Sequence, residues 1–272
     1  MRINKNIASL NIYREYSKNL IKQNSSLGRI SSGVKINSAK EDPNGLAQSE
    51  RFRMQIRGLQ MASNNAQDGV SMLQTAEGGL EGITSSLQRV RELLVQAGGT
   101  TTDSDKANIQ SEINQMVDGA SDMANNTEFN GVKLLNVDDP DKLEMVTGVN
   151  VGEKIKIPKY DLTKDGLGLK NINASNTDES LKSIDDALKV IIDARSKFGA
   201  LENRFQSSYD SITEITDKTQ EAESGIRDTD MATEIMEYSK YNILAEAGNA
   251  MMVQSNQLPQ NALKILENVR GR

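Results

Sequence analysis

Apolar residues recur at alternating steps of three and four over a long stretch of the first half of the chain. Such a repeat is typical of a coiled-coil seam. Asp42-Pro43 offers an N-cap followed by a first-turn proline, and Gly98-Gly99 offers a stop, so we predict one helix over about 44–98. The seam positions are Phe52, Ile56, Leu59, Ala62, Ala66, Val70, Leu73, Ala76, Leu80, Ile83, Leu87, Val90, Leu94 and Ala97.

Two further segments carry the same spacing. A shorter one between 109 and 123 predicts a helix folded back on the first. A longer one follows Asn176, which with Glu179 forms a plausible capping box, and it predicts a helix of more than 40 residues. In this second segment, the larger apolar residues indicate a change of register near Ala194.

Residues 132–172 have a different pattern. Apolar and charged residues alternate over 154–157, and Asn130-Gly131 marks a turn just before this region. We predict a small β-hairpin region between two helical halves.

The two ends carry weaker stripes, diluted by Asn, Ser and Gln, and neither predicts a helix that is stable alone. We expect an interruption at Pro259. The predicted fold is mainly α, an elongated antiparallel coiled-coil helical bundle with a small β-hairpin region in the middle of the chain. Its parts are 1–42, a body over 43–225, and 226–272. The end-stripe residues include Ile3, Ile7, Leu10, Leu27, Ile30, Met231, Ile235, Met252, Leu258 and Ile265.

Composition removes several classes of chemistry. The 272 residues include no Cys, no His and no Trp, which excludes zinc sites built on Cys or His, Fe–S clusters, disulfides and histidine-based triads. No nucleophile or phosphate-binding motif is present, so we expect neither an enzyme nor a cofactor. Asp138, Asp139 and Asp141 lack the spacing of a calcium loop, and we predict a solvated turn there.

Charge is unevenly distributed. Residues 1–35 carry a net charge of +6 and residues 36–226 a net charge of −11, which favours charge-guided association between copies. No basic helix is combined with stacking aromatics, so we expect no nucleic-acid binding. No run of about 18 apolar residues predicts membrane insertion, and the first residues lack a secretory signal pattern.

Several segments resemble bacterial flagellin over nearly the whole chain. The N-terminal signature is matched by LGRISSGVKINSAKEDPNGLAQSE (27–50) and LQRVRELLVQAGG (87–99), and the C-terminal signature by the run IRDTDMATEIMEYSKYNILAEAGNAMM from 226. TEFNGVKLL (127–135) resembles the family's link into its hairpin. The large variable insert of many flagellins is absent, so the chain resembles a minimal form.

This resemblance implies a secreted, extracellular subunit that polymerises into the flagellar filament for motility. The end stripes would pack as an inner tube, and export would use the flagellar type III apparatus. The implied partners are copies of the chain, an export chaperone at the C-terminal segment, and the filament cap and hook-junction proteins. The alternatives are a hook–filament junction protein or another non-enzymatic coiled-coil interaction protein.

The resemblance also implies recognition of the monomer by vertebrate Toll-like receptor 5. Arg89, Leu93 and Glu112 match the residues of the family's receptor motif. Leu93 falls off the Leu87–Val90–Leu94 seam, so we expect it at the surface beside Arg89.

Overall fold

The computed structural model describes residues 6–99, 102–136 and 143–270, with side chains except for 262–263 and 265–270. The chain divides into two compact units. One, the end unit, comprises Met1–Met54 and Thr219–Arg272, and the other, the body unit, comprises Gln55–Lys218. The elements in chain order are α1 (Ile7–Ser32), α2 (Pro43–Ala97), α3 (Asp103–Asn126), β1 (Glu128–Phe129), β2 (Val132–Lys133), β3 (Leu143–Val146), β4 (Lys154–Ile157), the 3-10 turn η1 (Leu169–Asn171), α4 (Thr177–Arg227) and α5 (Met231–Arg270).

The predicted long helix is α2, and its seam forms the core of the body unit. No seam residue between Leu73 and Ala97 is more than 2% exposed. The helix begins where the sequence indicates, because Asp42 Oδ1 accepts hydrogen bonds from the backbone N–H groups of Asn44 and Gly45 at 3.1 and 3.0 Å. Full burial of each Leu, Ile or Val of this seam contributes about 1.5–3 kcal/mol.

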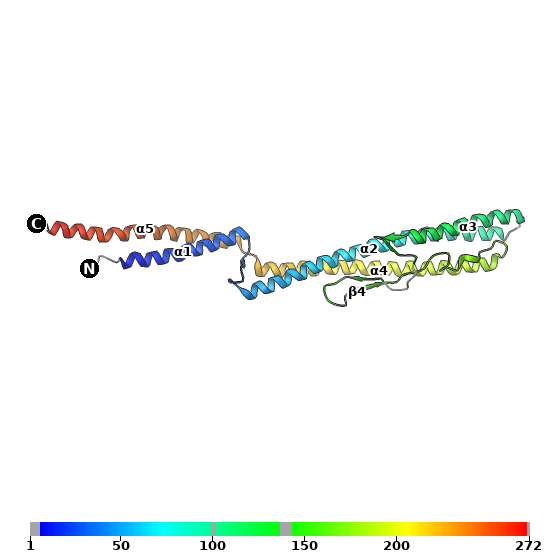
Figure 1. The fold of residues 1–272 in the computed structure, drawn as a ribbon, viewed down its shortest axis with the longest axis horizontal. Helices are drawn as coiled ribbons and strands as arrows, with labels where there is room; N and C mark the ends of the chain where they lie inside the picture. The colour runs from blue at the N-terminus through cyan, green and yellow to red at the C-terminus, as the bar shows by residue number, and fades with distance from the viewer. Residues whose placement is uncertain (1–5, 100–101, 137–142, 271–272) are drawn as a thin grey trace. The chain divides into compact units, whose positions relative to one another are not determined.

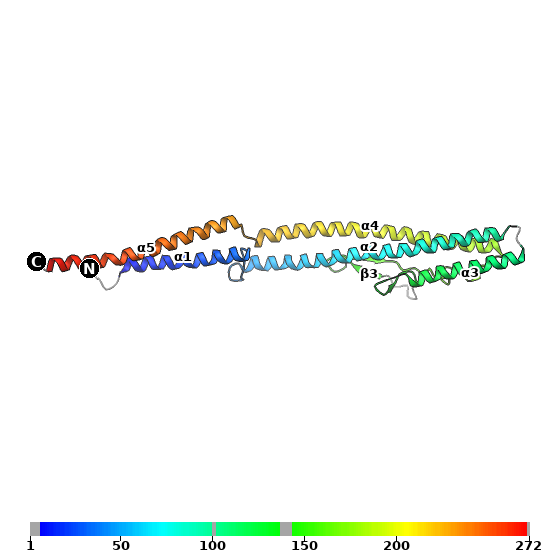
Figure 2. The same ribbon diagram turned by 90° about the horizontal axis from the view of Figure 1, so that it is seen from above.

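Helix α4 packs along α2 in the body unit, and both views show the two side by side (Figures 1 and 2). Its buried positions are Ile184, Ala187, Ile191, Ala194, Phe198, Phe205 and Ile212. They keep one heptad spacing throughout, so the predicted change of register near Ala194 is wrong. Two seam positions are alanines, and the half-buried Leu181 and Leu188 lie at the seam's edge, so the larger residues gave a misleading stripe.

Helix α3 covers a second face of α2. A Cβ at Gly79 would lie 2.5 Å from Thr127 Oγ1 and 3.0 Å from a methyl of Leu135, so only glycine permits this close approach. Ile109, Ile113 and other apolar residues of α3 complete the packing. Thr102 and Asp105 form a capping box at the start of α3, which the sequence prediction missed. Helix α2 is therefore buried on two sides rather than one.

Two small antiparallel hairpins follow α3, where one hairpin region over 132–172 was predicted. β1 and β2 pair across Asn130-Gly131, whose φ angles of 52° and 78° are those of a tight two-residue turn. β3 pairs with β4, and the alternation in β4 places Ile155 and Ile157 in the core while Lys154 and Lys156 face outward. The acidic cluster Asp138, Asp139 and Asp141 lies outside the described residues.

The end unit is an antiparallel pair of α1 and α5 (Figures 1 and 2). Gly33, with φ of 71°, ends α1, and its N–H donates to Arg29 O at 2.8 Å. Helix α5 runs continuously from Met231 to Arg270 with Pro259 inside it, so the predicted interruption at Pro259 is wrong.

Candidate functional site

The facing sides of α1 and α5 form a seam that is mostly polar or small. Buried and half-buried positions recur at steps of three and four on both helices. On α1 they are Ser9, Ile12, Tyr16, Asn19, Gln23, Ser26 and Ile30, and on α5 they are Glu234, Tyr238, Tyr241, Ala245, Gly248, Met252, Ser255 and Pro259. The seam therefore follows the coiled-coil geometry with a composition that supplies little apolar burial.

Hydrogen bonds and the ion pairs of Arg29 with Glu234 and Glu237 cross this seam. Gln23 Nε2 donates to Asn242 Oδ1 at 2.8 Å, and Arg29 Nη2 lies 2.8 Å from Glu234 Oε1. Glu234 is buried, and the hydrogen bond from Arg29 lowers the pKa of its carboxyl. Polar contacts of this kind specify register more than they add stability. The sequence prediction missed them because it scored only apolar residues, although Ser9, Asn19 and Gln23 carry the same spacing.

Most of the described large apolar residues of α1 and α5 point away from the seam. Ile7 is 70% and Leu258 is 66% exposed. The other exposed large apolar residues on these two helices are Leu10, Tyr13, Leu20, Ile21, Leu27, Met231, Ile235, Met236, Ile243, Leu244, Met251 and Val253. We call this set of residues the outer apolar face. Exposed apolar surface on this scale is typical of a protein interaction site.

The end-stripe residues named from the sequence divide between the two sides. Ile30 and Met252 lie in the seam, whereas Ile7, Leu10, Leu27, Met231, Ile235 and Leu258 belong to the outer apolar face. Ile3 lies outside the described residues. Ile265 lies in α5, but its side chain is outside the described part.

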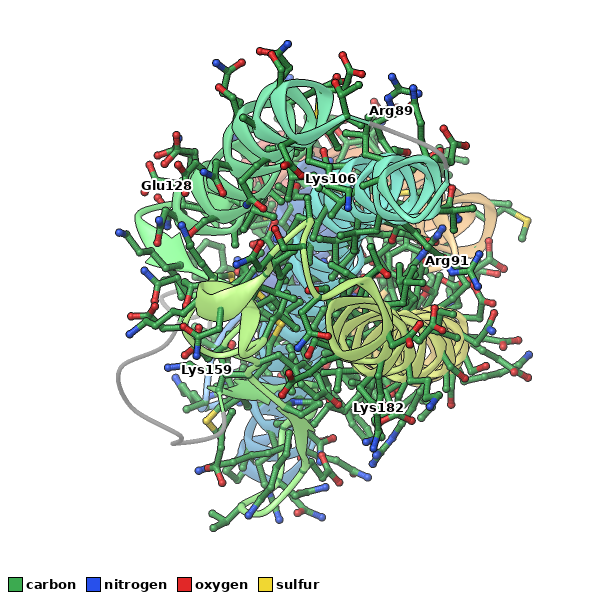
Figure 3. The ribbon with its side chains drawn as sticks, turned by 90° about the vertical axis from the view of Figure 1, so that its right-hand side faces the viewer. Arg89, Arg91, Lys106, Glu128, Lys159 and Lys182 are labelled. Atoms are coloured by element: carbon green, nitrogen blue, oxygen red, sulfur yellow. The ribbon has the colours of Figure 1, made fainter. Side chains whose placement is uncertain are left out.

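A charged cluster lies where α3 packs on α2. Arg89 Nη2 donates to Glu112 Oε1 at 3.1 Å, and Arg89 Nη1 donates to Glu92 Oε2 at 3.2 Å. All three side chains are exposed to a large extent, with Arg89 at 49%. The structure thus brings together Arg89 and Glu112, two of the three residues named from the receptor motif. Figure 3 labels Arg89 on the body unit.

Leu93 does not lie at the surface, and this expectation was wrong. It is 2% exposed and belongs to the same buried cluster as Ile109 and Ile113 of α3. Leu93 lies two heptads after Gly79, on the second face of α2, and α3 covers that face. The sequence showed one seam, and the second face is hard to detect because it carries Gly79 and Ser86 between Met72 and Leu93.

Metal binding and membrane insertion find no support in the part of the chain that the structure describes. Its acidic residues form no group of three that could hold a metal ion. Among the same residues, no helix is apolar and long enough to cross a bilayer.

Comparison with known proteins gives concordant matches. The family model described as the bacterial flagellin N-terminal helical region matches residues 3–138, and the model of the C-terminal helical region matches residues 181–266. A flagellin of Bacillus subtilis (strain 168) is 40% identical, with 98% of this chain and 100% of that protein covered. The flagellar filament 31.3 kDa core protein of Treponema maltophilum is 34% identical, again with 98% of this chain and 100% of that protein covered. Among solved structures, the crystal structure of Bacillus cereus flagellin is 25% identical, with a TM-score of 0.50 over 55% of this chain and 88% of that one.

Proposed function

The chain belongs to the bacterial flagellin family and is a structural subunit of the flagellar filament rather than an enzyme, and we propose that α1 and α5 form the inner tube of that filament. The sequence-based predictions of a mainly α fold and of a filament subunit for motility are confirmed. The inner tube is a finer assignment and comprises residues 1–42 and 226–272, with 43–225 as the surrounding rod-like body.

The observation that carries this proposal is the outer apolar face. In a single chain the α1–α5 pair buries polar residues in its seam and exposes Ile7, Leu10, Ile235 and Leu258 to water. Burying apolar surface is favourable by about 25 cal/mol per Å², so these residues favour contact with further copies. In the proposed inner tube, Ile7, Leu10, Leu27, Met231, Ile235 and Leu258 pack between copies, whereas Ile30 and Met252 pack in the α1–α5 seam within each chain.

Seeded polymerisation tests the function directly. Purified chain added to short fragments of its own filament is expected to elongate them, because each filament end offers partners for the outer apolar face. Elongation is followed by electron microscopy and by sedimentation, with the same protein lacking seeds as the control. A chain that stays in the supernatant at every concentration tested would contradict the proposal.

The subunit is extracellular in this proposal and leaves the cell through the flagellar type III apparatus. Before export, the exposed Ile243, Leu244 and Met251 of α5 need cover, and an export chaperone bound to the C-terminal segment supplies it. After export, the filament cap and the hook-junction proteins are the partners at the two ends of the filament.

The charged cluster of Arg89, Glu92 and Glu112 is the second proposed surface, and its partner is the monomer's receptor, Toll-like receptor 5. The guanidinium of Arg89 is held by Glu112 and Glu92 and still keeps half of its surface exposed. A held arginine loses less side-chain entropy on binding and can form a bidentate contact. Leu93 supports this surface from below instead of contacting the receptor.

Replacing Arg89 with Ala is expected to weaken receptor binding by the monomer by about 2 kcal/mol or more, which is roughly thirtyfold in Kd. The reason is that truncation removes both the contact and the arrangement of the two glutamates. Surface plasmon resonance on monomeric protein measures the change. Arg91→Ala is the matched control, since Arg91 is 51% exposed, has its own ion pair with Asp185, and projects from a different side of the body unit (Figure 3). Unchanged affinity of the Arg89→Ala variant, or an equal loss for Arg91→Ala, would refute this surface.

A further inference from the structure

Pro259 leaves one carbonyl in the interior of α5 without its helical donor. In an α-helix each backbone N–H donates to the carbonyl four residues earlier, and proline has no N–H. The carbonyl of Ser255 is the group affected, and Ser255 is buried at 7% exposure. A buried carbonyl with no donor destabilises the structure, so this position calls for a donor from outside α5.

Asn6 supplies that donor. Its Nδ2 donates to Ser255 O at 3.0 Å and also lies 3.2 Å from Ser255 Oγ and 3.3 Å from Asn256 Oδ1. The Oδ1 of the same amide accepts from Ser9 N at 3.1 Å and so caps the start of α1. Because the cap requires the oxygen, the NH₂ group must point toward α5. The side chain of Asn6 therefore pairs two backbone groups that have no helical partner, the N–H of Ser9 in α1 and the carbonyl of Ser255 in α5.

We infer that Asn6 and Pro259 form a register lock between α1 and α5. Every other described residue of α5 has a backbone N–H, so Ser255 is the one carbonyl that a proline deprives of its donor. If α1 slides by one heptad along α5, Asn6 no longer reaches this carbonyl, and the carbonyl stays buried and unpaired. The polar seam itself supplies little discrimination through apolar packing, which leaves the register to specific contacts such as this one.

The lock positions the outer apolar face. Ile7 follows Asn6 and Leu258 precedes Pro259, so the register fixed at this point sets the level at which these two exposed residues lie on neighbouring helices. The consequence for assembly rests on the proposed inner tube. Asn6 is a positioning residue in this scheme, and its hydrogen bonds are made within the chain.

A pair of cysteines reports the register, since the chain has none of its own. A Cβ built on Gly248 lies 3.5 Å from Tyr16 Cβ, which is within the range of a disulfide. The Tyr16→Cys/Gly248→Cys chain therefore forms an intrachain disulfide in the native register. A second reporter, Tyr16→Cys/Tyr241→Cys, has its α5 cysteine one heptad away, about 10 Å along the helix, and forms a disulfide only after a slip.

The variant that tests the lock is Asn6→Ser. Serine retains the N-cap oxygen but is too short to reach Ser255 O, so only the donor to α5 is lost. In each reporter chain, titration with glutathione measures the effective concentration of one cysteine at the other. Asn6→Ser is expected to lower the ratio of the native-register value to the slipped-register value about tenfold. Pro259→Ala gives residue 259 a backbone N–H that can donate to the carbonyl of Ser255. The Asn6→Ser/Pro259→Ala chain is therefore expected to recover the native ratio. Asn11→Ser, at an exposed position of α1, is the control and should leave the ratio unchanged.

Rescue by Pro259→Ala would support the lock, because a general loss of helix stability at Asn6 would persist in that background. An unchanged disulfide ratio in the Asn6→Ser chain, or the same fall with and without Pro259, would overturn it. Disulfides are scored within single chains before and after seeding. Failure to polymerise thus counts against the proposed function, and an unchanged ratio counts against the lock.

Discussion

Removing residues 1–30 or residues 240–272 is expected to abolish polymerisation and to leave a helical monomer. Each deletion removes one partner of the α1–α5 pair together with its share of the outer apolar face. The remaining helix cannot keep its polar seam, since an isolated amphipathic helix of this composition is marginal in water. The core of the body unit, from Ala66 to Phe205, contains none of the deleted residues.

Sedimentation after seeding measures the loss of polymerisation, and circular dichroism measures the helical content that stays. The two deletions serve as controls for each other, because each leaves the other helix in place. Ordinary filaments from either deletion would show that the ends are dispensable for assembly, and the inner-tube assignment would then be wrong.

A single charge placed on the outer apolar face is expected to have an effect of nearly the same size. Leu10 is 51% exposed in the single chain, so Leu10→Asp should leave the fold of the monomer intact. In the filament the new carboxylate would be buried between copies with no partner, at a cost of several kcal/mol. We expect the critical concentration for polymerisation to rise by about a hundredfold or more.

The matched control for this charge is Asn11→Asp, which introduces the same carboxylate at the adjacent, exposed polar position. It should polymerise at close to the normal critical concentration. Sedimentation over a concentration series compares the two variants. Equal behaviour of Leu10→Asp and Asn11→Asp would mean that Leu10 is not buried between copies.

The body unit could be predicted from the sequence in most respects. The seam of α2, the start at Asp42-Pro43, the turn at Asn130-Gly131 and the hairpin strand over 154–157 each follow from local signals that the structure satisfies. These signals agree with one another, because the spacing, the caps and the turn residues all specify the same elements. The register of α4 was misread, since alanines at two of its seam positions are easily overlooked.

The burial of Leu93 could not be predicted from α2 alone. The seam of α2 shows one buried face. Its second buried face depends on how another helix, α3, packs against it. The signal that could have found it is the combination of Gly79 with Leu93 two heptads later, since glycine on a helix surface permits another element to approach closely. The pairing of Arg89 with Glu112 depends on the same packing of α3 and was equally hidden from local patterns.

The sequence predicted two weak helical stripes at the ends of the chain. It did not predict which side of each helix faces the other. A search for apolar stripes found the exposed residues such as Ile7 and Leu10, whereas the side facing the partner helix carries Ser9, Tyr16 and Gln23. The sequence analysis expected a break at Pro259 because proline lacks the N–H that a helix interior needs. The donor that replaces this N–H comes from Asn6, nearly the whole chain away, and local patterns do not show it. Long-range polar contacts of this kind leave no periodic signal.

Cryo-electron microscopy of a filament assembled from the purified chain tests the central claim most directly. We expect α1 and α5 to line the channel as the innermost layer, with Leu10 and Leu258 buried between copies. Reconstruction at side-chain resolution distinguishes this arrangement from its reverse. A filament in which residues of the body unit line the channel, or in which Leu10 and Leu258 remain exposed to water, would contradict the claim.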